Sequence, residues 1–147
     1  MRWPALCALL LGVAGTGTAV SAATPFAVVT PDRTVELPQD HGAHPDHRTE
    51  WWYVTGWLET EAGETLGFQV TFFRTKPDLA ADNPSAFTPR QLIIGHAALS
   101  DPRRGKLWKD QRIARAVLGL AGAQTGETRV WLDHWSMQRT GSRYVTR

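Results

Sequence analysis

The sequence predicts an all-β fold, either an antiparallel β-barrel or a β-sandwich, on two observations. Segments rich in Val, Ile, Phe, Trp and Thr follow one another along most of the chain. Turns containing Gly, Pro, Asp and Asn separate these segments at short intervals. Successive strands joined by short turns are typical of an antiparallel sheet that closes as a barrel or folds as a sandwich.

Residues 1–23 have the pattern of a secretory signal peptide. Arg2 supplies a positive start, residues 5–14 form an apolar run, and small residues allow cleavage after Ala22 or Ala23. The apolar run is shorter than the about 20 residues that span a bilayer, although a retained N-terminal anchor is the alternative. We therefore predict an exported protein that is periplasmic, in a Gram-negative bacterium, or secreted.

Composition excludes several classes of function. Cys7 is the single cysteine and lies within the signal, so the mature chain has no thiol for a disulfide or for cysteine catalysis. The net charge is only +2 and the basic residues are scattered, which argues against a nucleic-acid partner. The sequence contains neither the Gly-x-Ser-x-Gly pattern of a serine hydrolase nor a glycine-rich phosphate loop.

The first predicted strands cover residues 50–58 and 66–74, joined by a polar hairpin connection. Apolar and polar residues alternate in the second of them, as in a half-buried strand. Residues 77–89 contain turn residues and predict a loop. Residues 91–100 are apolar on both faces, which predicts a central strand.

The C-terminal third is less regular. Residues 107–110 predict a short strand, and residues 111–122 are ambiguous between a helix and a looser segment. Residues 129–138 return to strand character, and a turn leads into a last strand over 143–147. Because the sequence stops within a strand pattern, we expect it to be part of a larger protein.

Aromatic residues are concentrated in and around the first strand, where they are candidates for binding an apolar ligand. Trp51 and Trp52 are adjacent on a strand and must face opposite sides of the sheet. One of them therefore lies outside the core, against a second domain, a loop or a membrane partner. The alternative is that these rings are simply core. The candidate ligand-binding residues are Trp51, Trp52, Tyr53, Trp57, Phe72 and His96.

Three histidines spaced three apart, His41, His44 and His47, suggest metal ligands. Gly42 and Pro45 break any helix that would align them, so hydrogen bonding within a loop is the favoured interpretation and no metal is predicted. Two further histidines lie in predicted strands: His96 is expected to be a satisfied core histidine, and His134 is undecided.

Two runs carry a resemblance to a known family: Asp40-His41-Gly42-Ala43-His44-Pro45 and Thr49-Glu50-Trp51-Trp52-Tyr53-Val54-Thr55-Gly56. With residues 66–74 and 91–101, they resemble the AttH/carotenoid 1,2-hydratase family over about residues 33–147. The resemblance implies two lipocalin-like β-barrel domains, with residues 24–147 forming an incomplete first domain. It also implies export, and an association with ABC-type transporter permeases.

The hydratase branch of that family adds water to an isoprenoid double bond without a cofactor. Such a reaction needs a carboxyl that stays protonated and aromatic faces that stabilise a carbocation. Glu50 beside Trp52 offers both, and His41 and His44 are further catalytic candidates. The more ordinary alternative is that Glu50 forms an ion pair with Arg48 or Arg74. Asp40 and Asp46 are reserve candidates.

The function we expect is therefore binding of an apolar, isoprenoid or lipid-like ligand, as an accessory to an ABC-type export system. The alternative is a cofactor-free hydratase, so whether the chain is an enzyme stays open. Neither hypothesis calls for a cofactor. Besides the ligand and the permease, the expected partner is the protein's own C-terminal domain.

Overall fold

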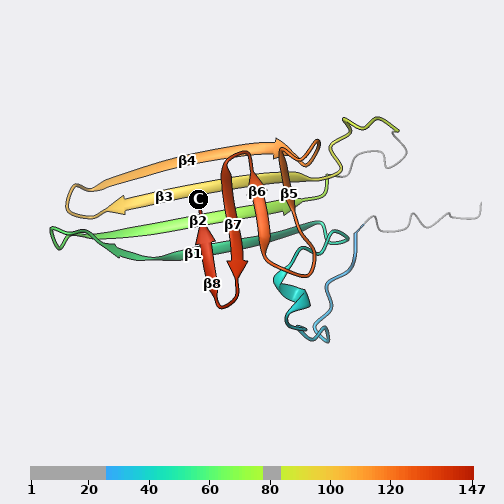
Figure 1. Ribbon diagram of the computed structural model, residues 1–147, viewed down its shortest axis with the longest axis horizontal. Helices are drawn as coiled ribbons and strands as arrows, with labels where there is room; N and C mark the ends of the chain where they lie inside the picture. Colours follow the sequence, from blue (N-terminus) through green and yellow to red (C-terminus); the bar gives the residue numbers. More distant parts are fainter. Residues whose placement is uncertain (1–25, 78–83) are drawn as a thin grey trace, which may run out of the picture.

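The computed structural model describes residues 26–77 and 84–147, which form two antiparallel sheets of four strands each (Figure 1). The predicted signal peptide, residues 1–23, lies outside the described residues. A single 3-10 turn, η1 (Gln39–His41), precedes the first strand in the described part of the chain. No helix there is long and apolar enough to cross a membrane.

The first sheet has the strand order β1-β2-β3-β4 and the second the order β5-β6-β7-β8. The strands of the first sheet are β1 (Thr49–Glu59), β2 (Thr65–Thr75), β3 (Leu92–Asp101) and β4 (Lys106–Arg115). Those of the second sheet are β5 (Ala121–Ala123), β6 (Arg129–Leu132), β7 (Trp135–Thr140) and β8 (Arg143–Thr146). Within each sheet, consecutive strands pair as antiparallel neighbours.

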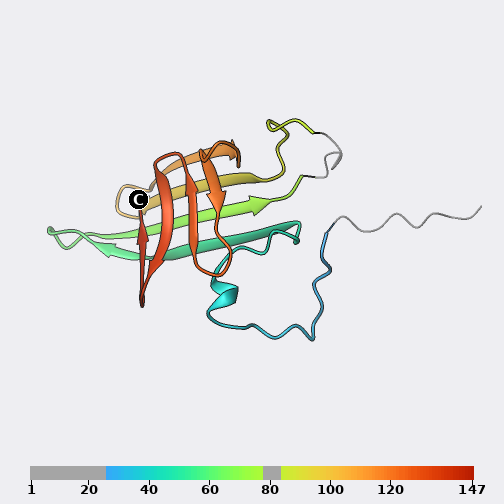
Figure 2. The ribbon, with the colours of Figure 1, turned by 45° about the vertical axis from the view of Figure 1, so that its right-hand side comes forward.

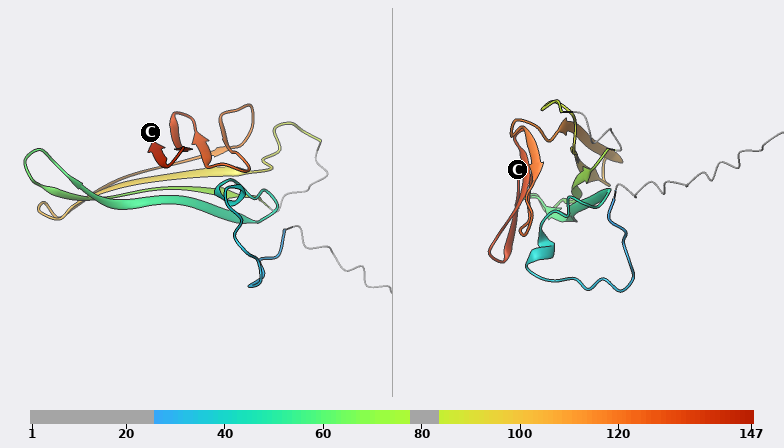
Figure 3. Two further views of the ribbon diagram at one scale, coloured as in Figure 1. Left: turned by 60° about the horizontal axis from the view of Figure 1, so that its bottom comes forward. Right: turned by 90° about the vertical axis from the view of Figure 1, so that its right-hand side faces the viewer.

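The two sheets lie face to face, and the short strands of the second cross the long strands of the first at a steep angle (Figures 1 and 2). The second sheet covers only one side of the first (Figure 3). The ends of the first sheet that carry the β1–β2 and β3–β4 turns extend beyond it. The predicted all-β, lipocalin-like fold is confirmed, and the layered arrangement is that of a sandwich.

The core lies between the sheets. Phe72 and Ile93 reach it from the first sheet, and Val130, Leu132 and Met137 reach it from the second, each with at most 2% of its surface exposed. Trp52, Val54, Val70 and Trp135 pack around this cluster. Alternation along each long strand sends one set of side chains into the core and the other set to the uncovered side.

Three predicted strands are confirmed with bounds that differ by one residue: those over 50–58, 66–74 and 91–100. The last of them is β3, which lies between β2 and β4 as a central strand should.

The prediction of a short strand over 107–110, followed by a helix or a looser segment, was wrong in part. β4 continues to Arg115, because residues 106–115 pair along the whole of β3. The strand ends where Leu118 and Gly119 adopt positive φ angles of 53° and 74°. Long-range pairing with β3 therefore overrides the weak helical spacing of this segment.

The single strand predicted over 129–138 is in fact two strands, β6 and β7. Asp133 has a φ of 58° and forms a two-residue hairpin turn with His134, which brings Leu132 opposite Trp135. Aspartate tolerates this left-handed conformation better than most residues do. The apolar residues on both sides of the turn hid it from sequence analysis.

The two faces of the long sheet should respond differently to the loss of a large apolar side chain. Ile93→Ala opens a cavity in the core and is expected to lower the free energy of unfolding by about 2–5 kcal/mol. Ile113→Ala, at a side chain that is 63% exposed on the uncovered face, should change it by less than about 0.5 kcal/mol. Urea unfolding of both variants measures the difference, and equal losses would contradict the assignment of the two faces.

Candidate functional site

Arg74 is the most deeply buried ionisable side chain in the described part of the chain, with no exposed surface. It comes from β2, and its guanidinium binds the loop that leads into β1. Nη2 donates hydrogen bonds of 2.8 Å to the carbonyl oxygens of His44 and of His47, and Nη1 lies 3.4 Å from that of Pro45. The predicted loop at these residues is thus fastened to the sheet by one side chain.

Glu50 lies opposite Arg74 in the β1–β2 register, and the two side chains form an ion pair in which Nε is 2.5 Å from Oε1. The Glu50 carboxylate also accepts the backbone N–H of His44 at 2.8 Å and 2.9 Å. Its Oε2 lies 2.9 Å from Nδ1 of the same histidine. The pairing of Glu50 with Arg74, considered above as the alternative to catalysis, is therefore present, and a catalytic role for Glu50 stays a prediction.

His44 lies between two carboxylates, with Nδ1 on Glu50 and Nε2 2.8 Å from Oδ1 of Asp40. Both ring nitrogens can donate only when the imidazole is protonated. The hydrogen bond to Asp40 raises the pKa of His44 above 6.5, and the Glu50 carboxylate adds to this effect. Both contacts therefore favour the protonated, imidazolium form of His44.

Asp40 belongs to the same network. Its Oδ2 accepts the backbone N–H of Glu36 at 2.7 Å, and its Oδ1 lies 2.8 Å from Arg33 Nη2. The pKa of Asp40 is held well below its usual range, first by the Glu36 N–H and then by His44. Asp40 thus links the segment around residue 33 to the loop that Arg74 fastens.

A pocket of about 440 Å³ opens beside this network, at the edge strand β1 and close to β8. The His41 carbonyl oxygen accepts Trp52 Nε1 at 3.2 Å and Thr128 Oγ1 at 2.8 Å. The Tyr144 hydroxyl lies 3.4 Å from His41 Nδ1. The pocket is lined by Asp40, His41, Gly42, His44, Glu50, Trp51, Trp52, Tyr53, Thr128 and Tyr144.

The candidate catalytic residues Glu50, His41 and His44 therefore line one pocket. Sequence analysis missed Thr128 and Tyr144, which are brought there from distant parts of the chain, and nothing in the local sequence marks either of them. Asp46, a reserve candidate, is exposed outside the pocket, and its carbonyl oxygen accepts the N–H of Ala27.

The three histidines spaced three apart in the sequence contact different partners. His41 faces Tyr144, His44 lies between its two carboxylates, and His47 Nδ1 lies 3.3 Å from the carbonyl oxygen of Ala27. Over residues 26–77 and 84–147, no group of three or more His, Cys, Asp or Glu side chains is arranged so that it could hold a metal ion. His134 is exposed and contacts Asp133, with Nδ1 2.8 Å from Oδ2.

The candidate ligand-binding residues divide between the two sides of the first sheet. Trp52 and Phe72 face the core. Trp51, Tyr53 and Trp57 face the uncovered side and are 57%, 60% and 79% exposed. The prediction that Trp51 and Trp52 face opposite ways is confirmed.

His96 also lies on the uncovered side, where its ring meets the edge of Phe73 at a centroid distance of 5.3 Å. The expectation that His96 is a core histidine was wrong. β3 is central within its sheet, but the second sheet covers only one of its faces. An apolar run on both faces of a strand does not by itself show that both are buried.

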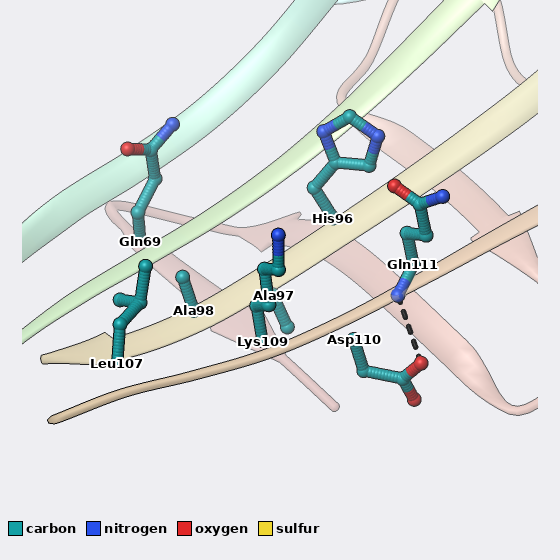
Figure 4. Close-up of a pocket in the computed structure, with 8 residues that line it drawn as sticks. All are labelled: Gln69, His96, Ala97, Ala98, Leu107, Lys109, Asp110 and Gln111. Atoms are coloured by element: carbon teal, nitrogen blue, oxygen red, sulfur yellow. Dashed lines mark hydrogen bonds between the residues drawn. The ribbon is translucent and has the colours of Figure 1, made fainter.

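This uncovered side, called here the open face, carries two neighbouring hollows. One, of about 450 Å³, is lined mainly by Thr55, Trp57, Gly67, Phe68 and Leu107. The other, of about 460 Å³, is lined by Gln69, His96, Ala97, Ala98, Leu107, Lys109, Asp110 and Gln111 (Figure 4). The ring of Trp57 lies across Gly67, 3.4 Å from where a Cβ would stand, so the glycine makes room for it.

The pKa of His44 predicts how stability depends on pH. A raised pKa in the folded state stabilises the fold below pH 6.5, and this contribution is lost as the pH rises through the raised value. We expect wild type to be more stable than His44→Gln at low pH, with the difference shrinking toward alkaline pH. Urea unfolding at a series of pH values measures it, with His96→Gln as the control histidine. A difference that stays constant with pH would contradict the double carboxylate contact.

Comparison with known proteins agrees with this architecture. Residues 28–147 match the family model described as AttH-like. The chain is 58% identical to a protein from Nitrosomonas europaea, provisionally assigned as an AttH, whose crystal structure superposes with a TM-score of 0.69 over 83% of this chain and 36% of that one. The chain thus spans about a third of that structure's length. No curated protein matches it. The chain belongs to the AttH-like family.

Proposed function

We propose that this domain binds an apolar ligand on the open face of the β1–β4 sheet. The observation that carries the proposal is the exposed ring of Trp57, which lines one of two adjoining hollows of about 450 and 460 Å³. Trp51 and Tyr53, on the same strand, are also exposed on this face. Large exposed apolar patches on a soluble fold mark binding surfaces. Hollows of this size fall in the range of small-molecule pockets, about 300–1,000 Å³.

The interior between the sheets is a less suitable place for a ligand. Phe72, Ile93 and Val130 have no exposed surface, and the space around them is filled by Trp52 and Trp135. A closely packed core of this kind admits a ligand only at the cost of its own contacts. The lipocalin-like layers therefore support binding on the open face instead of in a central cavity.

The proposed setting of this binding function is supported by the signal-like N-terminus and by the family resemblance. We propose that the protein is exported, as residues 1–23 suggest, and that it serves as an accessory of an ABC-type export system. The similar structure from Nitrosomonas europaea is nearly three times as long as the part that this chain matches. A second domain is therefore part of the proposal.

The hydratase alternative receives less support from the geometry. Protonating a carbon–carbon double bond requires a carboxyl that carries a proton and points at the substrate. Both oxygens of Glu50 instead accept hydrogen bonds, from Arg74 and from His44. Trp51, Trp52, Tyr53 and Tyr144 do line the same pocket as Glu50, so it is the hydrogen bonding of the carboxylate that counts against this alternative.

Removing an exposed ring from the open face should weaken ligand binding. Trp57→Ala in the full-length protein is expected to lower affinity for a long-chain isoprenoid alcohol by about tenfold, because an exposed Trp is a typical binding hot spot. Leu58→Ala, at the next residue but on the other side of the sheet, should leave affinity unchanged. Quenching of Trp fluorescence during ligand titration reports both, and equal losses would locate the ligand elsewhere.

Turnover is tested separately with the same isoprenoids. A product heavier by one water, lost in Glu50→Gln, would favour the hydratase alternative. Binding without such a product would favour a carrier or accessory.

A further inference from the structure

The open face carries the exposed rings of Trp51, Tyr53 and Trp57, but the charges on it are not balanced. By strand register, β4 contributes Lys109 and Arg115 to this face, and β1 contributes Glu59 at its far end. The other acidic residues of these four strands are Glu50, Asp101 and Asp110, which alternate onto the covered side. A positive charge therefore lies within an apolar surface without an acidic neighbour on the same face.

The two hollows form one continuous groove, because Gln69, Ala98 and Leu107 line both. Small residues form its floor: Gly67 on β2, with Ala98 and Ser100 on β3. Larger side chains stand on either side, with Trp57 at one end and Lys109 near the other. The groove thus has an aromatic end and a cationic end.

Lys109 and His96 are well placed to meet a ligand at the cationic end. Lys109 lies opposite Ala98 and His96 lies opposite Gln111, so the two cation-forming residues are diagonal neighbours on adjacent strands. Gln69, on the other side of Ala98, completes a half-ring of polar groups. Figure 4 shows Gln69, His96 and Lys109 projecting to the same side, whereas Asp110 points away from them.

None of the ion pairs formed by the described residues includes Lys109. Asp110, its neighbour in sequence, instead accepts the backbone N–H of Gln111 at 2.8 Å and lies 3.8 Å from Arg112. The ammonium group is therefore available for an anion that enters the groove.

We propose that the ligand of the open face is a long-chain monocarboxylate, such as a fatty acid. Its carboxylate binds Lys109, with His96 and Gln69 beside it, and its chain follows the small-residue floor toward Trp57. This inference rests on the proposed function, because it assigns the headgroup of the ligand at the same surface. A single lysine at one end of an apolar groove fits one anionic group with a tail, whereas attachment to an anionic membrane typically uses a cluster of basic residues.

The test compares two probes that differ only in the headgroup, hexadecanoate and hexadecan-1-ol, by calorimetric titration of the full-length protein below micelle-forming concentrations. The titration is run at about pH 8, where the carboxylate of the free acid is ionised. We expect hexadecanoate to bind about three- to tenfold more tightly than the alcohol, and less so at high salt, as for a partly solvated ion pair.

Lys109→Gln should abolish this preference, so that acid and alcohol bind this variant with equal affinity. Lys106→Gln is the matched control, because it removes the same charge from the same strand but on the covered side of the sheet. There Lys106 Nζ lies 4.9 Å from the centroid of the Trp108 ring. Wild-type preference in Lys106→Gln together with its loss in Lys109→Gln would support the proposal.

The remaining outcomes overturn it in distinguishable ways. Equal affinity for acid and alcohol, unchanged in Lys109→Gln, would refute the carboxylate assignment but keep the apolar ligand. Binding to vesicles of anionic phosphatidylglycerol without binding of monomeric hexadecanoate would replace the small ligand by a membrane surface. Binding of neither probe and no vesicle would refute the proposed function as well.

Discussion

The buried guanidinium of Arg74 holds together the part of the molecule in which the candidate site forms. Removing an arginine from water is costly unless its donors are satisfied, and here a carboxylate and three carbonyl oxygens satisfy them. Three of these partners belong to the loop before β1, and Glu50 also accepts the backbone N–H of His44 in that loop, so Arg74 and Glu50 together hold the loop against the sheet. The loop in turn positions His44 and, through it, Asp40.

This arrangement separates two chemical environments on one sheet. Toward the second sheet, the end of β1 that carries Glu50 is polar, closely hydrogen-bonded and connected to the pocket at His41 and Tyr144. Away from the second sheet, the same strand presents Trp51, Tyr53 and Trp57 to solvent. Alternation of side chains along a single strand is therefore enough to place a charged network and an aromatic surface back to back.

This separation of the two sides of β1 also explains why residues 40–58 contain most of the candidate functional residues. The motif of residues 40–58 contains histidines, acidic residues and aromatic rings close together in the sequence. This proximity suggests a single functional site. In the folded chain these residues serve three purposes: anchoring of the loop by Glu50, core packing by Trp52, and the open face by Trp57. Adjacency in sequence within a strand means opposite placement in space, so a dense motif need not be a single centre.

The sequence by itself determined the all-β class, the three long strands, their alternation and the opposite orientations of Trp51 and Trp52, because these depend on local periodicity. It also identified Arg74 as one of two possible ion-pair partners of Glu50, the other being Arg48. Tertiary structure alone decided the length of β4, the turn at Asp133, the exposure of His96 and the approach of Tyr144 to His41. Each of these depends on which strand or sheet packs against the residue, and contacts between distant segments leave no local pattern in the sequence.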